Sequence, residues 1–185
     1  KNIMNKFAVI VSARNESDVI EEFIHTVDLQ DYPSDLIDVY VIADNCSDDT
    51  AQKARIAGAH VYERFDNKKV GKGYALDFLF KILRSKKTKY DGYFIFDADN
   101  LLSRNYISEM NKVFNRKYKI VTSYRNSKNY DSNWISAGYS LWFLRESKYL
   151  NYARMLLNNS CAVSGTGFLI SSEIIDKNNG WKYHL

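Results

Sequence analysis

The sequence of 185 residues contains little proline, cysteine or glycine: Pro33 is the one proline, and there are two cysteines and eight glycines. Cys46 and Cys161 lie far apart and in no CxxC spacing, so they provide neither a zinc site nor a disulfide framework. We therefore expect reduced thiols in a cytoplasmic setting. With 45% hydrophobic and 26% charged residues, the composition excludes collagen-like and low-complexity chains. The length predicts a single domain over residues 1–185.

The sequence also lacks long apolar runs and a strong charge of one sign. No stretch approaches the roughly 20 apolar residues that a membrane-spanning helix needs. The net charge of +4, from 26 basic and 22 acidic residues, is too small to indicate nucleic-acid binding, which requires a basic stripe. Basic residues gather at 81–89, where a solvated helix end and a contact with anionic lipid headgroups are both open.

Aromatic residues are abundant, at 15% of the chain. Amphipathic tyrosines suit a domain that meets sugars or a membrane, and they suit equally a core with hydrated edges. The aromatic residues between positions 134 and 143 have the same two interpretations, helix packing or a sugar-binding platform. They are Trp134, Tyr139, Trp142 and Phe143.

Short apolar runs alternate with helical patterns along the chain. The runs predict strands at residues 7–11, 39–43, 59–62, 93–96 and 119–123, and a further apolar run covers 168–170. The helical spacing predicts helices at 17–27 (with Ser17 as N-cap), 49–57, 71–83, 103–115, 134–157 and 172–177. This alternation predicts an α/β fold with a mostly parallel sheet and helices on both faces.

In such a sheet, ligands bind beyond the carboxyl ends of the strands. The sharpest feature there is Asp97-Ala98-Asp99, directly after the fourth predicted strand. Two carboxylates so close together repel each other unless a positive charge lies beside them, and their oxygens suit a hard divalent cation such as Mg²⁺. The alternative is that both acids cap the following helix.

Other polar loops follow the same rule. Asp44 ends the second predicted strand, where its carboxylate can accept a hydrogen bond from a nucleobase N–H, and Ser12 and Arg14 can line the same pocket. The residues at 47–49 are good helix caps. Lys72 lies at a helix start, where it meets a phosphate or is simply an exposed lysine in a flexible turn.

The last candidate is a small-residue loop at positions 164–167. Its two glycines allow the backbone to approach another surface closely, or they form a simple turn. The loop consists of Ser164, Gly165, Thr166 and Gly167.

Five segments together, 9–16, 41–50, 71–76, 94–99 and 164–167, resemble the family 2 glycosyltransferases, which are inverting enzymes with the GT-A fold, a Rossmann-like nucleotide-diphospho-sugar fold. The resemblance covers roughly residues 6 to 170 in register. It implies a UDP-sugar donor, a divalent metal (Mg²⁺ or Mn²⁺) and a glycan or lipid-linked acceptor hydroxyl. The pattern is most similar to membrane-bound synthases of hyaluronan, cellulose and poly-N-acetylglucosamine.

The resemblance also implies residue roles. Ser12, Arg14 and Glu16 match the uridine-contacting loop, and Asp44 matches the carboxylate that reads uracil. Lys72 matches a basic position near the diphosphate, Asp97 lies near the donor ribose or sugar, and Asp99, with Asp97, holds the metal. The loop at 164–167 matches the acceptor side.

Family members continue with a Thr-Glu-Asp or similar acid that acts as the catalytic base, and this motif is absent from residues 1–185. We therefore expect a domain truncated before its base, which would follow Leu185. Membrane helices would also follow, and would place the full-length protein at the cytoplasmic face of the membrane. Two alternatives stay open: a nucleotidyltransferase that makes nucleotide-sugars, and a non-catalytic nucleotide-binding or assembly module whose acids are only helix caps.

Overall fold

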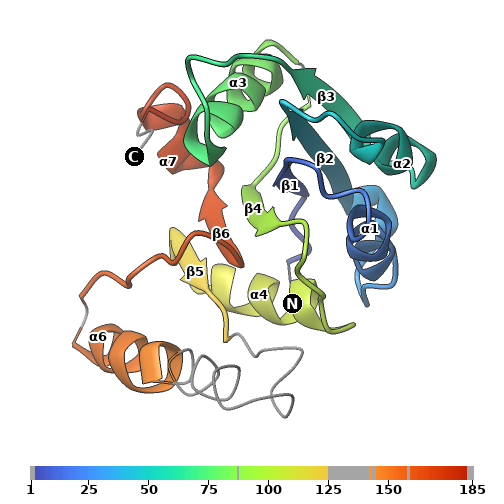
Figure 1. Cartoon of the computed structure of the whole chain (residues 1–185). Coiled ribbons are helices and arrows are strands. Elements are labelled where there is room, and N and C mark those ends of the chain that lie inside the picture. The colour runs from blue at the N-terminus through green and yellow to red at the C-terminus, as the bar shows by residue number, and fades with distance from the viewer. Residues whose placement is uncertain (1–2, 87, 125–141, 143–144, 158, 183–185) are drawn as a thin grey trace.

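A computed structural model of the chain describes residues 3–86, 88–124, 142, 145–157 and 159–182. Within these residues, six strands form one sheet that is flanked by helices (Figure 1). The strands are β1 (Phe7–Ala13), β2 (Ile37–Asp44), β3 (His60–Arg64), β4 (Gly92–Asp97), β5 (Ile120–Thr122) and β6 (Phe168–Ser171). The helices are α1 (Ile20–Asp28), η1 (Ser34–Leu36), α2 (Thr50–Ile56), α3 (Lys72–Ser85), α4 (Tyr106–Phe114), the π-helical η2 (Arg145–Asn151), α6 (Tyr152–Leu156) and α7 (Ser172–Lys177).

The strand order is β3-β2-β1-β4-β6-β5. Strands β3, β2, β1 and β4 are parallel, whereas β6 runs antiparallel to both β4 and β5. Strand β5 therefore points the same way as β4, and five carboxyl ends meet at one edge of the sheet. This arrangement confirms the mostly parallel α/β sheet.

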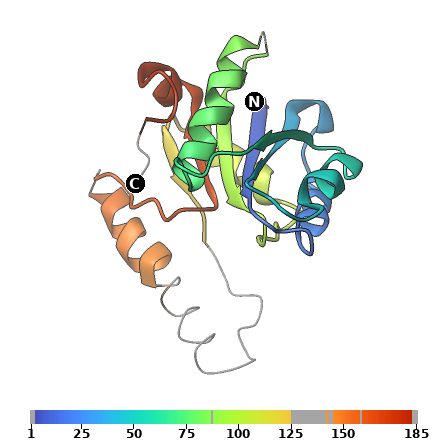
Figure 2. The ribbon, with the colours of Figure 1, turned by 45° about the horizontal axis from the view of Figure 1, so that its top comes forward.

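Helices cover both faces of the sheet, as predicted (Figure 2). Successive residues of a strand point to opposite faces, so Val9 packs in the cluster with α1, α2 and α4, and Ile10 packs in the cluster with α3 and α7. Phe23 of α1 and Leu79 of α3 are both fully buried in these two layers. The two apolar clusters fix the position of the strand ends that carry the polar loops.

Three sequence expectations change in the structure. The apolar run at 168–170 is the antiparallel strand β6. Ser17 is not the N-cap of α1, because the helix begins at Ile20 after Val19, with no side-chain cap, and Ser17 N–H donates to Asp48 instead. The expected helix at 134–157 is seen at Trp142, η2 and α6, while Trp134, Tyr139 and Phe143 lie outside the described residues.

The segment formed by η2 and α6 lies at the β5 side of the sheet, away from β1 and β2 (Figures 1 and 2). Several of its side chains are exposed, among them Tyr149, Tyr152 and Leu156. Among the described residues, no helix is both long enough and apolar enough to cross a membrane.

Candidate functional site

Asp44 and Arg64 form a buried ion pair at the ends of β2 and β3. The two residues are register partners, so the sheet itself places them side by side. Arg64 Nη1 lies 2.5 Å from Asp44 Oδ1, and only 3% of Asp44 and 8% of Arg64 are exposed. The guanidinium also donates to Asp66 and to the carbonyl of Lys69. The predicted base-reading carboxylate is thus fixed in position by a partner on the neighbouring strand.

Two asparagines join the loops that follow β1, β2 and β3. Asn15 and Asn45 have φ values of 55° and 53°, which asparagine tolerates better than most residues. Asn15 Oδ1 accepts the Ser47 N–H at 2.8 Å, and Asn45 Oδ1 accepts the Asp66 N–H at 2.9 Å. The predicted Ser12–Glu16 and Asp44–Asp49 loops therefore form one continuous rim.

Lys72 lies at the centre of the site and contacts Asp97. Its Nζ donates to Asp97 Oδ1 at 2.5 Å and to the Gly165 carbonyl at 2.8 Å. Gly71, with φ of 122°, provides the turn that starts α3 at this point. Lys72 is half-buried, lies in the first turn of α3 and makes both contacts, so it is not an exposed lysine in a flexible turn.

Thr166 connects the loop at 164–167 to the Asp97–Asn100 turn. The Asp97 N–H donates to Thr166 Oγ1 at 2.8 Å, and the Thr166 hydroxyl donates to Asn100 Oδ1 at 2.6 Å. Gly167 N–H donates to the Ile95 carbonyl of β4. The loop that the resemblance assigns to the acceptor side is therefore bonded to the backbone of Asp97 and to the side chain of Asn100, in the turn that carries the two predicted metal-binding acids.

The charges of several acids act on Glu16. Partial burial, and after it the charges of Asp99, Asp97 and Asp48, raise the pKa of Glu16. The charges of acids from the loops after β2 and β4 therefore reach Glu16 in the loop after β1, while Lys72 pairs with Asp97 in the same region. Within the described residues, no three His, Cys, Asp or Glu side chains are grouped closely enough to hold a metal alone. Asp97 and Asp99 fit a Mg²⁺ or Mn²⁺ ion whose remaining ligands are phosphate oxygens and water.

The helix-cap alternative for Asp97 and Asp99 is wrong. Helix α4 begins at Tyr106 with Asn105 as its N-cap, so neither acid is at the helix start. For the residues at 47–49 the cap interpretation holds in part, because the Asp48 carboxylate accepts the N–H and hydroxyl of Thr50 at the start of α2. The two acids after β4 are therefore not explained by helix capping.

The sheet register sets the distances along the edge. Ser12 of β1 is the register partner of Asp97 of β4, and β1 lies between β4 and β2. Neighbouring strands are about 4.8 Å apart, so β2 and β4 are roughly 10 Å apart, and Asp44 lies two residues beyond Ile42, the β2 partner of Ser12. Both carboxylates thus lie at the same edge of the sheet. Arg14 is exposed on the same rim.

A family model described as glycosyltransferase-like family 2 matches residues 5–184. The chain belongs to this family. No curated protein matches the chain. As a family 2 glycosyltransferase-like domain with the GT-A fold, it can be compared with solved structures of the same architecture.

Mannosyltransferase PcManGT from Pyrobaculum calidifontis, in complex with GDP-Man and Mn²⁺, has a TM-score of 0.69 and 18% identity, over 96% of this chain and 48% of that one. The structure of S. aureus TarS 1–349 in complex with UDP-GlcNAc has a TM-score of 0.66 and 16% identity, and the match covers 94% of this chain and 47% of that one. Glucosyl-3-phosphoglycerate synthase from Mycobacterium tuberculosis, in complex with Mn²⁺, UDP and phosphoglyceric acid, has a TM-score of 0.57 and 20% identity. The match covers 92% of this chain and 57% of that one. At these identities the likeness is one of fold, and the chain spans about half the length of these proteins.

We expect Thr166→Val to loosen the link between the acceptor-side loop and Asp97. The variant leaves the Asp97 N–H and the Asn100 side-chain oxygen without their shared partner, at a cost of about 1–2 kcal/mol in the free energy of unfolding. Urea denaturation measures this change. Ser85→Ala, which removes a hydroxyl bond at the exposed end of α3, is the control and should change stability by less than about 0.5 kcal/mol. Equal effects of the two variants would contradict the bridging role of Thr166.

Glu16→Gln is expected to raise thermal stability by up to about 2 °C at pH 7. Because the pKa of Glu16 is raised in the folded chain, its ionisation at neutral pH opposes folding. The gain should vanish at about pH 3, where Glu16 is protonated in both states. Differential scanning calorimetry at the two pH values tests this. A variant that is less stable than wild type at pH 7 would show that the charge of Glu16 is not opposed by the neighbouring acids.

Proposed function

We propose that this domain binds the donor of an inverting glycosyltransferase, which transfers a hexosyl or N-acetylhexosaminyl group from a UDP-sugar to an acceptor hydroxyl. The observation that carries the proposal is the contact of Lys72 with both Asp97 and the Gly165 carbonyl. This contact joins the residues that we propose for the phosphate side to the loop that we propose for the acceptor side. Membership of the family and the nucleotide-sugar complexes of similar folds support it.

In the proposed reaction, the acceptor oxygen bonds to the anomeric carbon as the bond from that carbon to the diphosphate oxygen breaks. Asp44 accepts the N–H of the uracil, and Ser12, Arg14 and Glu16 line the nucleoside. Asp97 and Asp99 would hold a divalent cation. When bound, this cation would offset the negative charge that develops on the diphosphate leaving group. Lys72 adds a second positive charge near the same group.

The acceptor hydroxyl must lose its proton to a base. By resemblance to the family, we propose that an acid of the Thr-Glu-Asp type serves as this base, in a polysaccharide or cell-envelope glycan synthase. On this proposal, residues 1–185 bind UDP and metal and transfer sugar poorly.

Isothermal titration with UDP, UDP-glucose, UDP-N-acetylglucosamine, UDP-galactose and GDP-mannose, each with and without Mn²⁺, tests the proposal. We expect Mn²⁺-dependent binding of the uridine nucleotides in preference to GDP-mannose. A pyrophosphate-release assay with UTP and sugar 1-phosphate separates the proposal from nucleotidyl transfer. Release of pyrophosphate, or an absence of UDP binding in the presence of Mn²⁺, would contradict it.

A further inference from the structure

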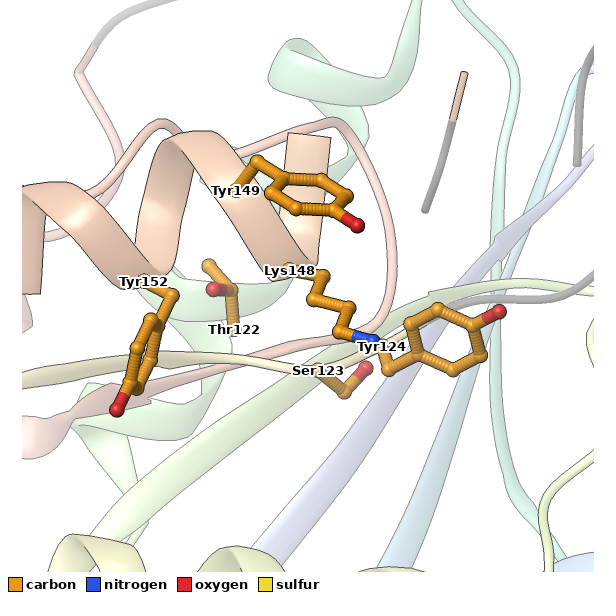
Figure 3. A pocket seen from close by; sticks show the side chains of 6 residues that line it. All are labelled: Thr122, Ser123, Tyr124, Lys148, Tyr149 and Tyr152. Carbon is orange, nitrogen blue, oxygen red and sulfur yellow. The ribbon is translucent and has the colours of Figure 1, made fainter. Parts of the chain in front are cut away.

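An open hollow of about 700 Å³ lies between the end of β5 and η2, apart from the donor residues (Figure 3). Its described lining residues are Thr122, Ser123, Tyr124, Lys148, Tyr149 and Tyr152. The three tyrosines are 56%, 60% and 55% exposed. More than half of each of these residues is therefore accessible to a ligand.

The hollow begins where the acceptor-side loop ends. Ser123 Oγ donates to the Gly167 carbonyl at 3.0 Å, and the Tyr106 hydroxyl donates to the same carbonyl at 3.2 Å. Strand β5 points the same way as β4 and lies two strand positions from it, so the hollow is roughly 10 Å along the edge from Asp97. A short oligosaccharide can span that distance while its terminal hydroxyl reaches the donor site.

The chemistry of the lining suits a sugar with a negative charge. A tyrosine presents an apolar ring face and a polar hydroxyl, which match the C–H face and the hydroxyls of a sugar ring. Thr122 adds a hydroxyl on the strand side. Lys148 extends from η2 toward Tyr124 (Figure 3), with its Nζ 6.0 Å from the centre of the Tyr149 ring. The lining residues that the structure describes include no acid to neutralise this lysine.

We propose that this hollow is an acceptor subsite that binds a glycan unit bearing a carboxylate or a phosphate, with the sugar ring against Tyr149 and Tyr152 and the anion at Lys148 Nζ. The proposal rests on the proposed function, since it makes the hollow a continuation of the acceptor side. It also gives the exposed aromatic residues of this segment a role that helix packing does not.

Saturation-transfer NMR and titration of the chain with four probes test the subsite. The probes are a tetrasaccharide of alternating glucuronate and N-acetylglucosamine, neutral chitotetraose, glucose 6-phosphate and inorganic phosphate. We expect at least one of the two charged sugars, the glucuronate tetrasaccharide or glucose 6-phosphate, to bind at least about five-fold more tightly than chitotetraose. Whichever of the two binds more tightly shows whether the anion of the natural ligand is a carboxylate or a phosphate. Inorganic phosphate binding as tightly as the charged sugars would overturn the proposal.

Variants assign the effect to the residues. Lys148→Gln should remove the preference for charged sugars, and Tyr149→Ala with Tyr152→Ala should weaken all sugar binding at least about ten-fold, whereas the corresponding Phe variants keep most of it. Tyr118→Ala and Lys112→Gln, exposed residues outside the hollow, are the controls. Equal losses in the control variants would overturn the proposal.

Two further measurements separate the alternatives. UDP binding with Mn²⁺ should be unchanged within two-fold in the hollow variants. If wild type binds UDP and no sugar probe, the subsite is wrong and the donor proposal stands. If wild type binds the charged sugar and no UDP, the donor proposal is wrong and the sugar-binding hollow stands. If the hollow variants lose binding to phosphatidylglycerol vesicles and keep sugar binding, the surface is a lipid-binding face and the proposal is overturned.

Discussion

Replacing Arg64 by methionine is expected to destabilise the fold by about 3–5 kcal/mol, because it leaves a buried carboxylate without its charged partner. Asp44 is 3% exposed, so water cannot replace the guanidinium at its Oδ1. The same variant removes the bond to the Lys69 carbonyl, which anchors the loop that leads to α3. We also expect weaker UDP binding at temperatures where the variant stays folded, since Asp44 is no longer held in one position.

Urea denaturation of three variants tests the assignment. Arg55→Met removes an ion pair with Glu63 that is exposed on both sides, and should cost less than about 1 kcal/mol. Combining Arg64→Met with Asp44→Asn removes the unpaired charge as well as the pair, and should recover a large part of the lost stability. If Arg64→Met costs no more than Arg55→Met, the Asp44–Arg64 pair does not stabilise the fold.

Asp99→Asn is expected to lower the Mn²⁺-dependent affinity for UDP by on the order of 100-fold or more. Loss of an outer partner of a metal ligand already costs roughly 10–100-fold in metal affinity, and Asp99 is proposed as a direct ligand. The side chain is exposed and accepts a bond from its neighbour Asn100. The fold should therefore be unaffected, and the whole loss should appear in metal-dependent binding.

Calorimetric titration of UDP with Mn²⁺ and then with EDTA measures this effect. Asp35→Asn is the control, because Asp35 is an exposed acid in η1, next to the start of β2 and thus at the opposite edge of the sheet. Wild type and the control should lose UDP affinity in EDTA, and Asp99→Asn should show the low affinity in both conditions. An unchanged titration for Asp99→Asn would disprove its assignment as a metal ligand.

Much of the fold and the site could be predicted because the relevant signals are local. Strand β1 is a continuous apolar run whose residues are buried on both faces, as a central parallel strand requires. Once the strands are placed, the rule that ligands bind at carboxyl ends brings Asp44 and Asp97 to one edge. The structure has them at the ends of β2 and β4, on that edge.

The missed features depend on contacts between distant parts of the sequence. Arg64 lies two residues beyond the predicted end of the third strand, and only the register with β2 reveals its pairing with Asp44. A run such as Phe168–Ile170 has no sequence signal for direction, so the antiparallel β6 was not assigned. The contact of Lys72 with Gly165 joins residues 93 positions apart. Arg64, Asn15 and Asn45 carry polar side chains next to predicted strand ends, which is the signal that could have identified them.

The insertion of β6 between β4 and β5 has a consequence for biosynthesis. Strand β4 ends at Asp97 and its partner β6 begins at Phe168. At ribosomal rates of about 5–20 residues per second, the edge of β4 stays unpaired for about 4–15 s after it emerges. An apolar strand with a free edge is a template for wrong pairing with another chain. Nascent chains of this protein should therefore be vulnerable to aggregation, and most in need of a chaperone, during that interval.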